Sequence, residues 1–268
     1  MFFPRSAALL TLVAAGAGYA QSINSLSTQC QATLASLVVS SENACLNPTD
    51  LVSIVTAGAN DSLVQPINNW LSGMCAQPQC TNQTLSDIVS NVTTGCASDL
   101  QSLGAGDVNA EEITNIVQMA YPTVRKVACL KDTSNDTLCL TQTLTNVQSS
   151  IGTLSKSEIQ QLVSQISAGQ IPSIPSSAYC TDCDKEALNI AKTDFPDLFN
   201  SNVQSAVSGQ CSADFVDGAT PSGVQQTANT ATASANGLVN NGATMGQMPV
   251  GIAISAILTL SSAFAFLA

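Results

Sequence analysis

The sequence predicts an all-α fold that is braced by disulfides and followed by a disordered stalk. Apolar residues recur at helical spacing through most of the chain, alternating strand patterns are scarce, and there are ten cysteines. An even number of cysteines behind a secretory leader is typical of a chain that folds in an oxidising compartment and forms, here, five disulfides. The cysteines expected to pair are Cys30, Cys45, Cys75, Cys80, Cys96, Cys129, Cys139, Cys180, Cys183 and Cys211.

Residues 1–20 have the pattern of a secretory signal peptide. Arg5 precedes an apolar run from Ala7 to Ala15, and small residues stand at positions 18 and 20, three and one before the expected cut. A buried N-terminal helix is the alternative, but the run is too short to span a bilayer and its flanks fit cleavage. We therefore expect the mature chain to begin at Gln21.

The end of the chain predicts a glycosylphosphatidylinositol (GPI) anchor. Val250 to Ala268 form an uncharged run with no Lys or Arg after it. A transmembrane helix, the alternative, usually has a basic cytoplasmic flank, so the run better matches a removed attachment signal over residues 242–268. We expect attachment at Asn241, with Ser234-Ala235-Asn236 as the second choice.

Residues 218–241 form the expected stalk. No residue from Gly218 to Met248 is charged, and most are small and polar. This composition cannot bury enough apolar surface to fold alone, so we expect a flexible segment whose Ser and Thr are open to O-glycosylation. An ordinary loop is the alternative. The Cys-rich helical domain then spans residues 21–217.

Apolar stripes predict the helices of this domain. They lie over residues 85–96, 113–127, 140–154 and 159–166, and each repeats at the three- and four-residue spacing of one helix face. We expect the second to be interrupted or kinked at Pro122, which cannot donate a backbone hydrogen bond. The stripes indicate packed core rather than a cofactor site.

Two local patterns predict where helices begin. Asn47 and Pro48 precede an apolar stripe and supply a helix cap and a first-turn proline. Ser155 and Glu158 form a capping box, in which each side chain can satisfy a free backbone amide of the first turn.

The order of the cysteines suggests an internal duplication. Residues 30–96 and 129–211 each hold five cysteines, and in each a Cys-Leu dipeptide opens a helical stretch that ends at a close cysteine pair. Since five is odd, at least one bridge must join the two halves if all ten cysteines pair. The sequence leaves the pairing itself open.

Composition and charge exclude several classes of function. The chain has no His, which excludes Ser-His-Asp and Cys-His catalytic arrangements and His-ligated zinc. Without Arg5, six basic residues face 18 acidic ones, and this net charge of −12 repels nucleic acid. We expect no nucleic-acid partner.

Candidate catalytic and metal residues have structural explanations. Cys180 and Cys183 have redox spacing, but acidic neighbours raise the pKa of a thiol, and no second pair at matching spacing completes a zinc site. Glu111 and Glu112 are adjacent on a helix and cannot face each other across a sugar cleft. We expect no catalytic, cofactor-binding or metal-binding residues.

The remaining charged and glycosylation motifs point to the surface. We expect the basic residues Arg125, Lys126 and Lys131 to form a solvated face or to pair with nearby acids such as Asp132. Asn-x-Ser/Thr sequons mark solvent-facing positions if they are glycosylated. The expected N-glycosylation sites are Asn60, Asn82, Asn91 and Asn135.

Two short segments carry a resemblance to a known family. They are Ala-Cys-Leu-Lys-Asp-Thr-Ser at 128–134 and Cys-Thr-Asp-Cys-Asp-Lys-Glu at 180–186. With the leader, stalk and tail, they resemble the GPI-anchored, Cys-rich surface mannoproteins of fungi, particularly the immunoreactive mannoproteins of basidiomycetes. The resemblance implies a glycosylated wall or membrane protein and offers no catalytic residues.

The sequence therefore predicts a non-catalytic, glycosylated surface protein. We expect a GPI lipid to hold it in the outer leaflet of the plasma membrane or in the cell wall, where it has a structural, adhesive or host-interaction role and contacts wall glycan. The alternative is an extracellular binding module that holds a sterol or fatty acid between its helices, because the chain has many Leu, Ile and Val and few charges. The sequence argues for no cofactor and no enzymatic activity.

Overall fold

The computed structural model describes residues 26–102, 109–167 and 174–231, which are mostly helical and disulfide-braced, as predicted. The expected signal peptide, Asn241 and residues 242–268 lie outside these ranges. The elements, with 3₁₀ helices marked η, are α2 (Thr28–Val39), η2 (Ser41–Leu46), α3 (Pro48–Thr56), α4 (Val64–Ala76), α5 (Asn82–Gly95), α6 (Ala97–Ser102), α7 (Ala110–Ala128), β1 (Leu130–Asp132), β2 (Thr137–Leu138), α8 (Cys139–Ile151), α9 (Lys156–Ser167), η3 (Ser176–Ala178), α10 (Asp182–Asp194), η4 (Pro196–Leu198), α11 (Ser201–Cys211), η5 (Ala213–Val216) and β3 (Val224–Gln226).

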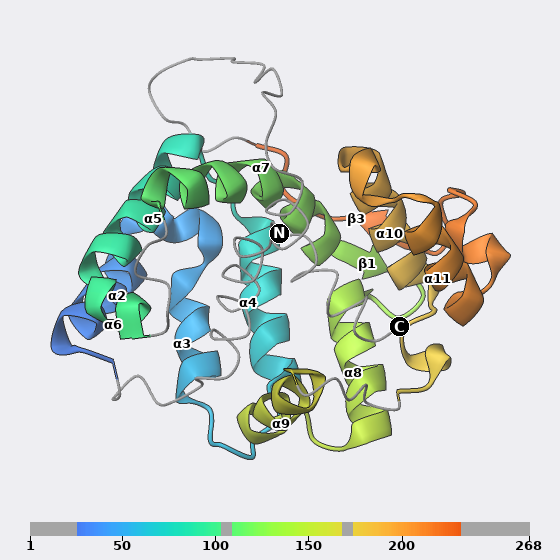
Figure 1. Cartoon of the computed structure of the whole chain (residues 1–268), viewed down its shortest axis with the longest axis horizontal. Coiled ribbons are helices and arrows are strands. Elements are labelled where there is room, and N and C mark those ends of the chain that lie inside the picture. The colour runs from blue at the N-terminus through green and yellow to red at the C-terminus, as the bar shows by residue number, and fades with distance from the viewer. Residues whose placement is uncertain (1–25, 103–108, 168–173, 232–268) are drawn as a thin grey trace, which may run out of the picture.

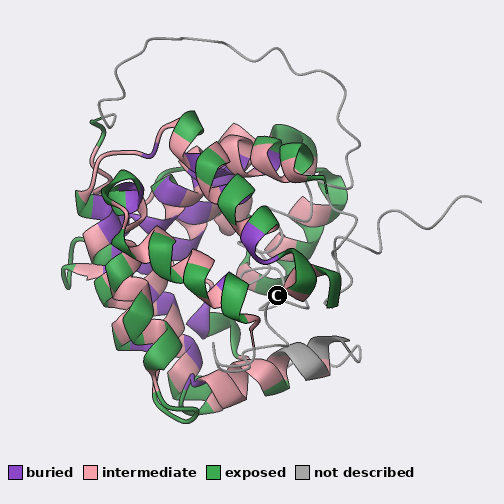
Figure 2. Cartoon of the chain, turned by 90° about the vertical axis from the view of Figure 1, so that its left-hand side faces the viewer, coloured by how far each residue is buried: buried purple, intermediate pink, exposed green. Residues whose placement is uncertain are grey.

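Helix α7 connects two groups of helices across the top of the view in Figure 1. On one side it packs against α5, which in turn contacts α2, and on the other side it packs against α10. Helices α4 and α8 pack against each other below α7, and α3 lies along α4. Figure 2 shows buried and exposed positions alternating along these helices, as expected for helices with one buried face.

The predicted apolar stripe forms the buried face of α7. Ile116, Ala120 and Tyr121 are buried, and the Tyr121 hydroxyl accepts a hydrogen bond from the backbone amide of Cys80 at 3.0 Å. Of the two outcomes expected at Pro122, an interruption and a kink, the interruption does not occur, since the helix continues to Ala128. Burial of this face outweighs the one backbone hydrogen bond that Pro122 cannot make.

The two predicted helix starts occur, but each differs in its hydrogen bonds. Asn47 is the residue before α3, yet its side chain donates to the Asp50 carboxylate at 2.7 Å and to the carbonyl of Trp70 instead of capping the helix. Ser155 caps α9 by accepting from the amide of Glu158 at 3.2 Å. The Ser155 amide donates to the carbonyl of Thr153, which replaces the second half of the capping box.

A small sheet corrects the expected start of the stalk. Strand β1 pairs antiparallel with both β2 and β3, and β3 lies within residues 218–231, which the sequence assigns to the stalk. Beyond β3, the carbonyl of Ala231 accepts from the amide of Gln79 at 2.9 Å. The stalk boundary at residue 218 is therefore wrong, and the folded part extends at least to Ala231.

The C-terminal end of α4 explains why this polar segment packs. Asn229 donates its backbone amide to the carbonyl of Cys75 at 2.9 Å and its side-chain amide to the carbonyl of Ala76 at 3.0 Å. The last carbonyls of a helix have no partner within the helix and must find one elsewhere. The segment is held by these backbone groups, so it needs no apolar periodicity of its own.

Arg125 completes this cap and corrects a second expectation. Only 3% of Arg125 is exposed, so it is not part of a solvated face. Its guanidinium donates to the carbonyls of Met74, at 2.9 Å, and Gln77 at the end of α4, and also to the carbonyl of Asn229. A cation at a helix C-terminus interacts favourably with the helix dipole.

Replacing Arg125 with Met should destabilise the protein strongly. The Arg125→Met substitution removes the charged donor from the carbonyls of Met74 and Gln77, and hydrogen bonds to charged groups contribute about 1.5–3 kcal/mol each. We expect a loss of about 3 kcal/mol or more, measured by chemical denaturation with the disulfides intact.

The neighbouring Lys126→Met substitution is the matched control. Lys126 pairs with Asp194 at 2.8 Å, but 48% of its side chain is exposed, and exposed pairs contribute at most about 1 kcal/mol. Equal losses of stability in the two variants would contradict the capping role of Arg125.

Candidate functional site

All ten predicted cysteines form disulfides, and no described cysteine is free. The bridges connect positions 31 to 66 residues apart and tie together most of the helices. They are Cys30–Cys96, Cys45–Cys80, Cys75–Cys129, Cys139–Cys183 and Cys180–Cys211. Five disulfides are typical of an extracellular, secreted protein.

The pairing repeats only in part between the two predicted halves. Cys75–Cys129 is the bridge that joins them. The second and fourth cysteines pair in each half, as Cys45–Cys80 and Cys139–Cys183, whereas the other pairings differ. The duplication therefore stays a prediction.

The Cys-x-x-Cys segment does not form a redox pair. Cys180 is bonded to Cys211, and Cys183 is bonded to Cys139. Each cysteine thus fixes the start of α10 to a different neighbouring element. This geometry agrees with the structural role that the sequence suggests.

The asparagines of all four sequons are exposed. Asn60 lies between α3 and α4, Asn82 and Asn91 lie on α5, and Asn135 lies in the hairpin between β1 and β2. The side chain of Asn135 donates to Asp132 at 3.2 Å, which holds the hairpin tip. All four positions can carry a glycan without displacing the core, and their use stays a prediction.

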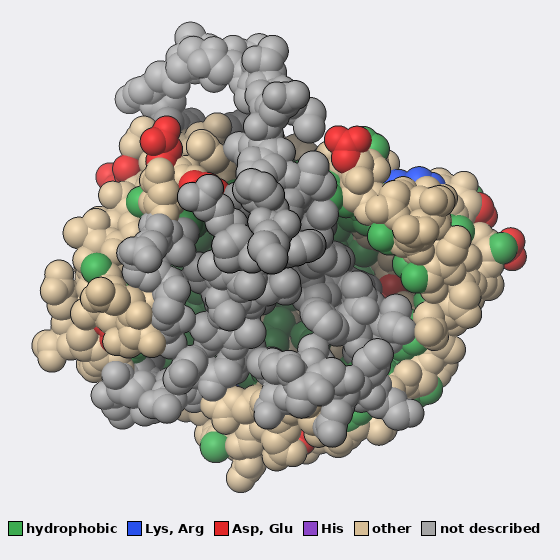
Figure 3. Space-filling model, viewed as in Figure 1, with side chains coloured by type: hydrophobic (Ala, Val, Ile, Leu, Met, Phe, Trp, Pro, Cys, Tyr) green, Lys and Arg blue, Asp and Glu red, His purple; other side chains and the backbone are tan. Residues whose placement is uncertain are grey.

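Every basic side chain in the described part of the chain is already engaged. Lys126, Lys131 and Lys185 pair with Asp194, Asp136 and Asp217. The other three donate to backbone carbonyls; they are Arg125, Lys156 and Lys192. Figure 3 shows acidic side chains at several places on one face and basic ones in a small area only. The charged groups of the described surface that have neither an ion-pair partner nor a backbone carbonyl partner are therefore acidic.

The paired acids of the sequence form no reactive cluster. Glu111 and Glu112 are exposed in the first turn of α7, where Asn109 accepts from the amide of Glu111 at 2.9 Å. Within residues 26–102, 109–167 and 174–231, no group of three acidic or cysteine side chains is arranged to hold a metal ion.

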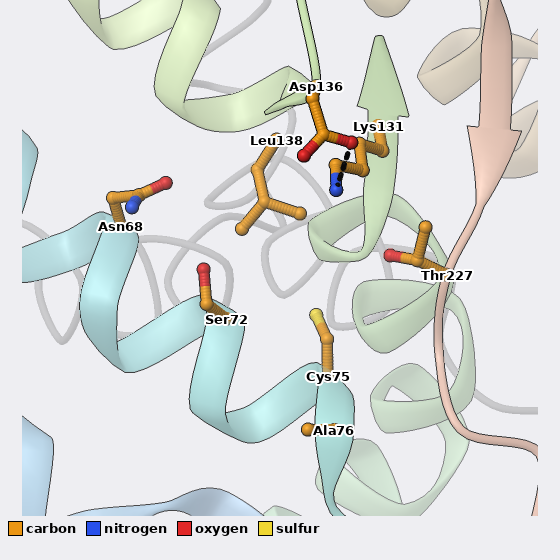
Figure 4. A pocket seen from close by; sticks show the side chains of 8 residues that line it. All are labelled: Asn68, Ser72, Cys75, Ala76, Lys131, Asp136, Leu138 and Thr227. Carbon is orange, nitrogen blue, oxygen red and sulfur yellow. Dashed lines mark ion pairs between the residues drawn. The ribbon is translucent and has the colours of Figure 1, made fainter. Parts of the chain in front are cut away.

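A cavity of about 270 Å³ lies between α4 and the β1–β2 hairpin. Figure 4 shows side chains from α4 on one wall and the ion pair of Lys131 and Asp136 on the other, with 2.6 Å between the paired atoms. The lining residues are Asn68, Ser72, Cys75, Ala76, Lys131, Asp136, Leu138 and Thr227.

Several polar groups of the cavity keep unused hydrogen-bonding capacity. Asn68 accepts from Thr141 at 2.8 Å through its side-chain oxygen. Its amide nitrogen and the Ser72 hydroxyl have no partner among the described residues. Thr227 donates its hydroxyl to the carbonyl of Cys129 at 2.7 Å, which leaves its oxygen free to accept.

Asp184 is the most deeply buried acid of the described chain, with 2% of its surface exposed. It accepts hydrogen bonds from the hydroxyls of Thr143, at 2.9 Å, and Thr181, at 2.6 Å. Burial raises the pKa of Asp184 to about 6, against the opposing effect of these hydrogen bonds. Asp184 lies in the first turn of α10, next to Cys183, which is bonded to Cys139. We interpret its burial as a consequence of this position.

Comparison with known proteins adds no relative: no family model, no curated protein and no solved structure matches the chain. Among the helices that the structure describes, none combines the length and apolar character needed to cross a bilayer.

The apolar periodicity of the sequence predicts neither the cavity nor the buried charges. One signal was present, since Asn68, Ser72 and Ala76 recur every four residues and mark a polar or small face of a helix. The hairpin residues gave no such signal, because the approach of β1 and β2 to α4 depends on the Cys75–Cys129 bridge.

Asp184 should make stability depend on pH between about 4 and 6. Its folded-state pKa of about 6 exceeds the ordinary value of 3.8, so the folded state holds this proton more tightly than the unfolded state. The stabilisation by protonated Asp184 is fully present below about pH 4 and is lost as the pH rises towards 6. From about 1.4 kcal/mol per pKa unit, we expect a loss of about 2–3 kcal/mol.

Denaturation midpoints from pH 4 to pH 7 measure this effect. The Asp184→Asn variant should lack the wild-type slope in this range, whereas Asp182→Asn, on an exposed neighbour in the same turn, should keep it. An unchanged slope in Asp184→Asn would refute the assignment. Asp99 and Asp194 do not produce this slope, because hydrogen bonds lower their pKa values. The stability that these two carboxylates contribute is lost only at lower pH.

Mild reduction should open Cys180–Cys211 before any other bridge. These two cysteines are half-buried, whereas the other eight are buried, and reductant attack on a disulfide requires access to the sulfur. Alkylation during stepwise reduction, followed by peptide mapping, measures the order. Earlier labelling of Cys75 and Cys129 would show that burial does not control it.

Proposed function

We propose that this protein is a non-catalytic, GPI-anchored glycoprotein of the cell surface or cell wall, where it acts by contact in a structural, adhesive or host-interaction role. The observation that carries the proposal is the exposure of all four sequon asparagines around a five-disulfide domain. Glycans at these positions would cover three parts of the surface: the α3–α4 loop, helix α5 and the β1–β2 hairpin. The fungal mannoprotein resemblance agrees with this proposal.

The charge arrangement supports contact with neutral partners. All described basic side chains are engaged within the domain, and the remaining surface is acidic or neutral. Such a surface repels anionic lipid headgroups and nucleic acid. Neutral wall glycan has no charge to be repelled and offers hydroxyls to the many Ser, Thr and Asn side chains.

The described cavity does not favour the alternative role as a carrier of a sterol or fatty acid. Its volume of about 270 Å³ lies below the roughly 300–1,000 Å³ that is typical of drug-sized ligand sites. An ion pair and three amide or hydroxyl side chains line it, whereas an apolar ligand needs a largely apolar lining. We therefore propose the surface role and not the carrier.

Phosphatidylinositol-specific phospholipase C should release the protein from intact cells that express the full chain. The enzyme cleaves the lipid of a GPI anchor, so the protein should move from the cell fraction to the medium, as measured by immunoblotting. A variant that lacks residues 250–268 is the control and should enter the medium without the enzyme. Persistent attachment together with an intact C-terminal peptide would refute GPI anchoring.

A further inference from the structure

We propose that the cavity between α4 and the β1–β2 hairpin binds one neutral sugar ring. This inference deepens the proposed contact with glycan and rests on that proposal only for the natural source of the saccharide. The site takes its polar groups from three separate segments: α4, the hairpin and the residues after β3. Figure 4 shows these side chains arranged around a shared space.

The size of the cavity suits a small ligand. Its 270 Å³ falls just under the range for drug-sized molecules, which matches a single sugar ring better than an oligosaccharide or a lipid. Ser72 and Ala76 are exposed on α4, so a ring at the end of a longer chain can enter from solvent.

The hydrogen-bonding groups match adjacent sugar hydroxyls. A hydroxyl both donates and accepts. The Lys131 ammonium uses one of its three N–H groups on Asp136, and that carboxylate keeps further lone pairs, so the pair presents a donor beside an acceptor. On the opposite wall, the Asn68 amide donates and the Ser72 hydroxyl can do either.

The charge and the floor of the cavity favour a neutral ligand with an apolar face. Lys131 and Asp136 cancel each other's charge, and the acidic surface repels phosphates and carboxylates. Leu138, Ala76 and the Cys75 side chain supply apolar surface, against which the C–H groups of a sugar ring can pack.

The sugar could come from either of two sources, the wall glycan or the protein's own glycan. The Asn135 sequon stands next to Asp136 in the hairpin, so a glycan at Asn135 would begin close to the cavity. Both sources offer the same sugar-ring chemistry, and removal of N-glycans distinguishes them.

The test is saturation-transfer NMR on the full-length protein, purified from a eukaryotic host in a detergent without a sugar headgroup. The probes are free D-mannose, D-glucose and N-acetyl-D-glucosamine, each titrated before and after enzymatic removal of the N-glycans. At least one should bind with a dissociation constant of about 1–10 mM, since an open site with few polar contacts provides about 3–4 kcal/mol.

Two substitutions test the location of the site. Ser72→Phe fills the cavity from an exposed helix position and should weaken binding at least tenfold. Asp136→Asn removes the charged acceptor but suits the left-handed backbone at φ 59°, and it should weaken binding about tenfold. Asn69→Phe is the matched control, because Asn69 is exposed on α4 outside the cavity; its binding should stay within about twofold.

Binding before and after glycan removal supports an external saccharide as the ligand. Binding only after removal supports occupation by the Asn135 glycan. If no probe binds in either state, or if Ser72→Phe binds as tightly as Asn69→Phe while both unfold at the wild-type midpoint, the proposal is overturned. The phospholipase test of anchoring is independent of every one of these results.

Discussion

The C-terminal end of α4 sets the constraint on which the rest of the fold depends. The last carbonyls of the helix have no partners in the next turn, so donors from other segments bind them. Arg125 of α7 and Asn229 near the end of the described chain supply them. The Cys75–Cys129 bridge joins the same two helices covalently. This junction fixes α7 against α4, and α7 in turn positions α5 on one side and α10 on the other.

Low charge and strong covalent bracing are complementary properties of this domain. The described part of the chain holds six basic side chains, and all are used to hold backbone carbonyls or nearby acids. Most acids therefore have no basic partner, so ion pairs between helices contribute little to specifying one helix arrangement. Each disulfide restricts the unfolded chain and stabilises by about 2–4 kcal/mol. The bridges thus provide the specificity that charge pairs provide in many other helical proteins.

The sequence predicts the helices well because burial imposes a period on apolar residues. Leu85 and Val89 of α5 and Ile116 and Ala120 of α7 are buried at their predicted spacing. The sequence also predicts that all ten cysteines pair, because a secretory leader indicates an oxidising compartment and the number of cysteines is even. It cannot predict the partners, which depend on how distant segments meet.

The other differences arise from contacts that leave no periodic mark. A buried Arg125 looks like a surface cation in sequence, because its partners are backbone carbonyls that every residue possesses. Asn229 packs for the same reason in a segment whose composition suggests disorder. The buried Asp184 accepts hydrogen bonds from the hydroxyls of Thr143 and Thr181, which come from two different parts of the chain. The same reasoning applies to the cavity, whose opposite walls are far apart in sequence.

The docking of residues 218–231 bears on the proposed anchor, because it would limit the distance between the domain and the membrane. With the lipid at Asn241, nine residues would lie between Ala231 and the anchor, and the ten Cα–Cα steps would reach about 35 Å at full extension. The chain leaves the domain beside Gln79, which is bonded to Ala231 and lies three residues before Asn82. With the proposed anchor, the edge near Gln79 would face the bilayer, and a glycan on Asn82 would lie between the domain and the membrane. In this arrangement the domain would lie close to the membrane and would not project through the wall.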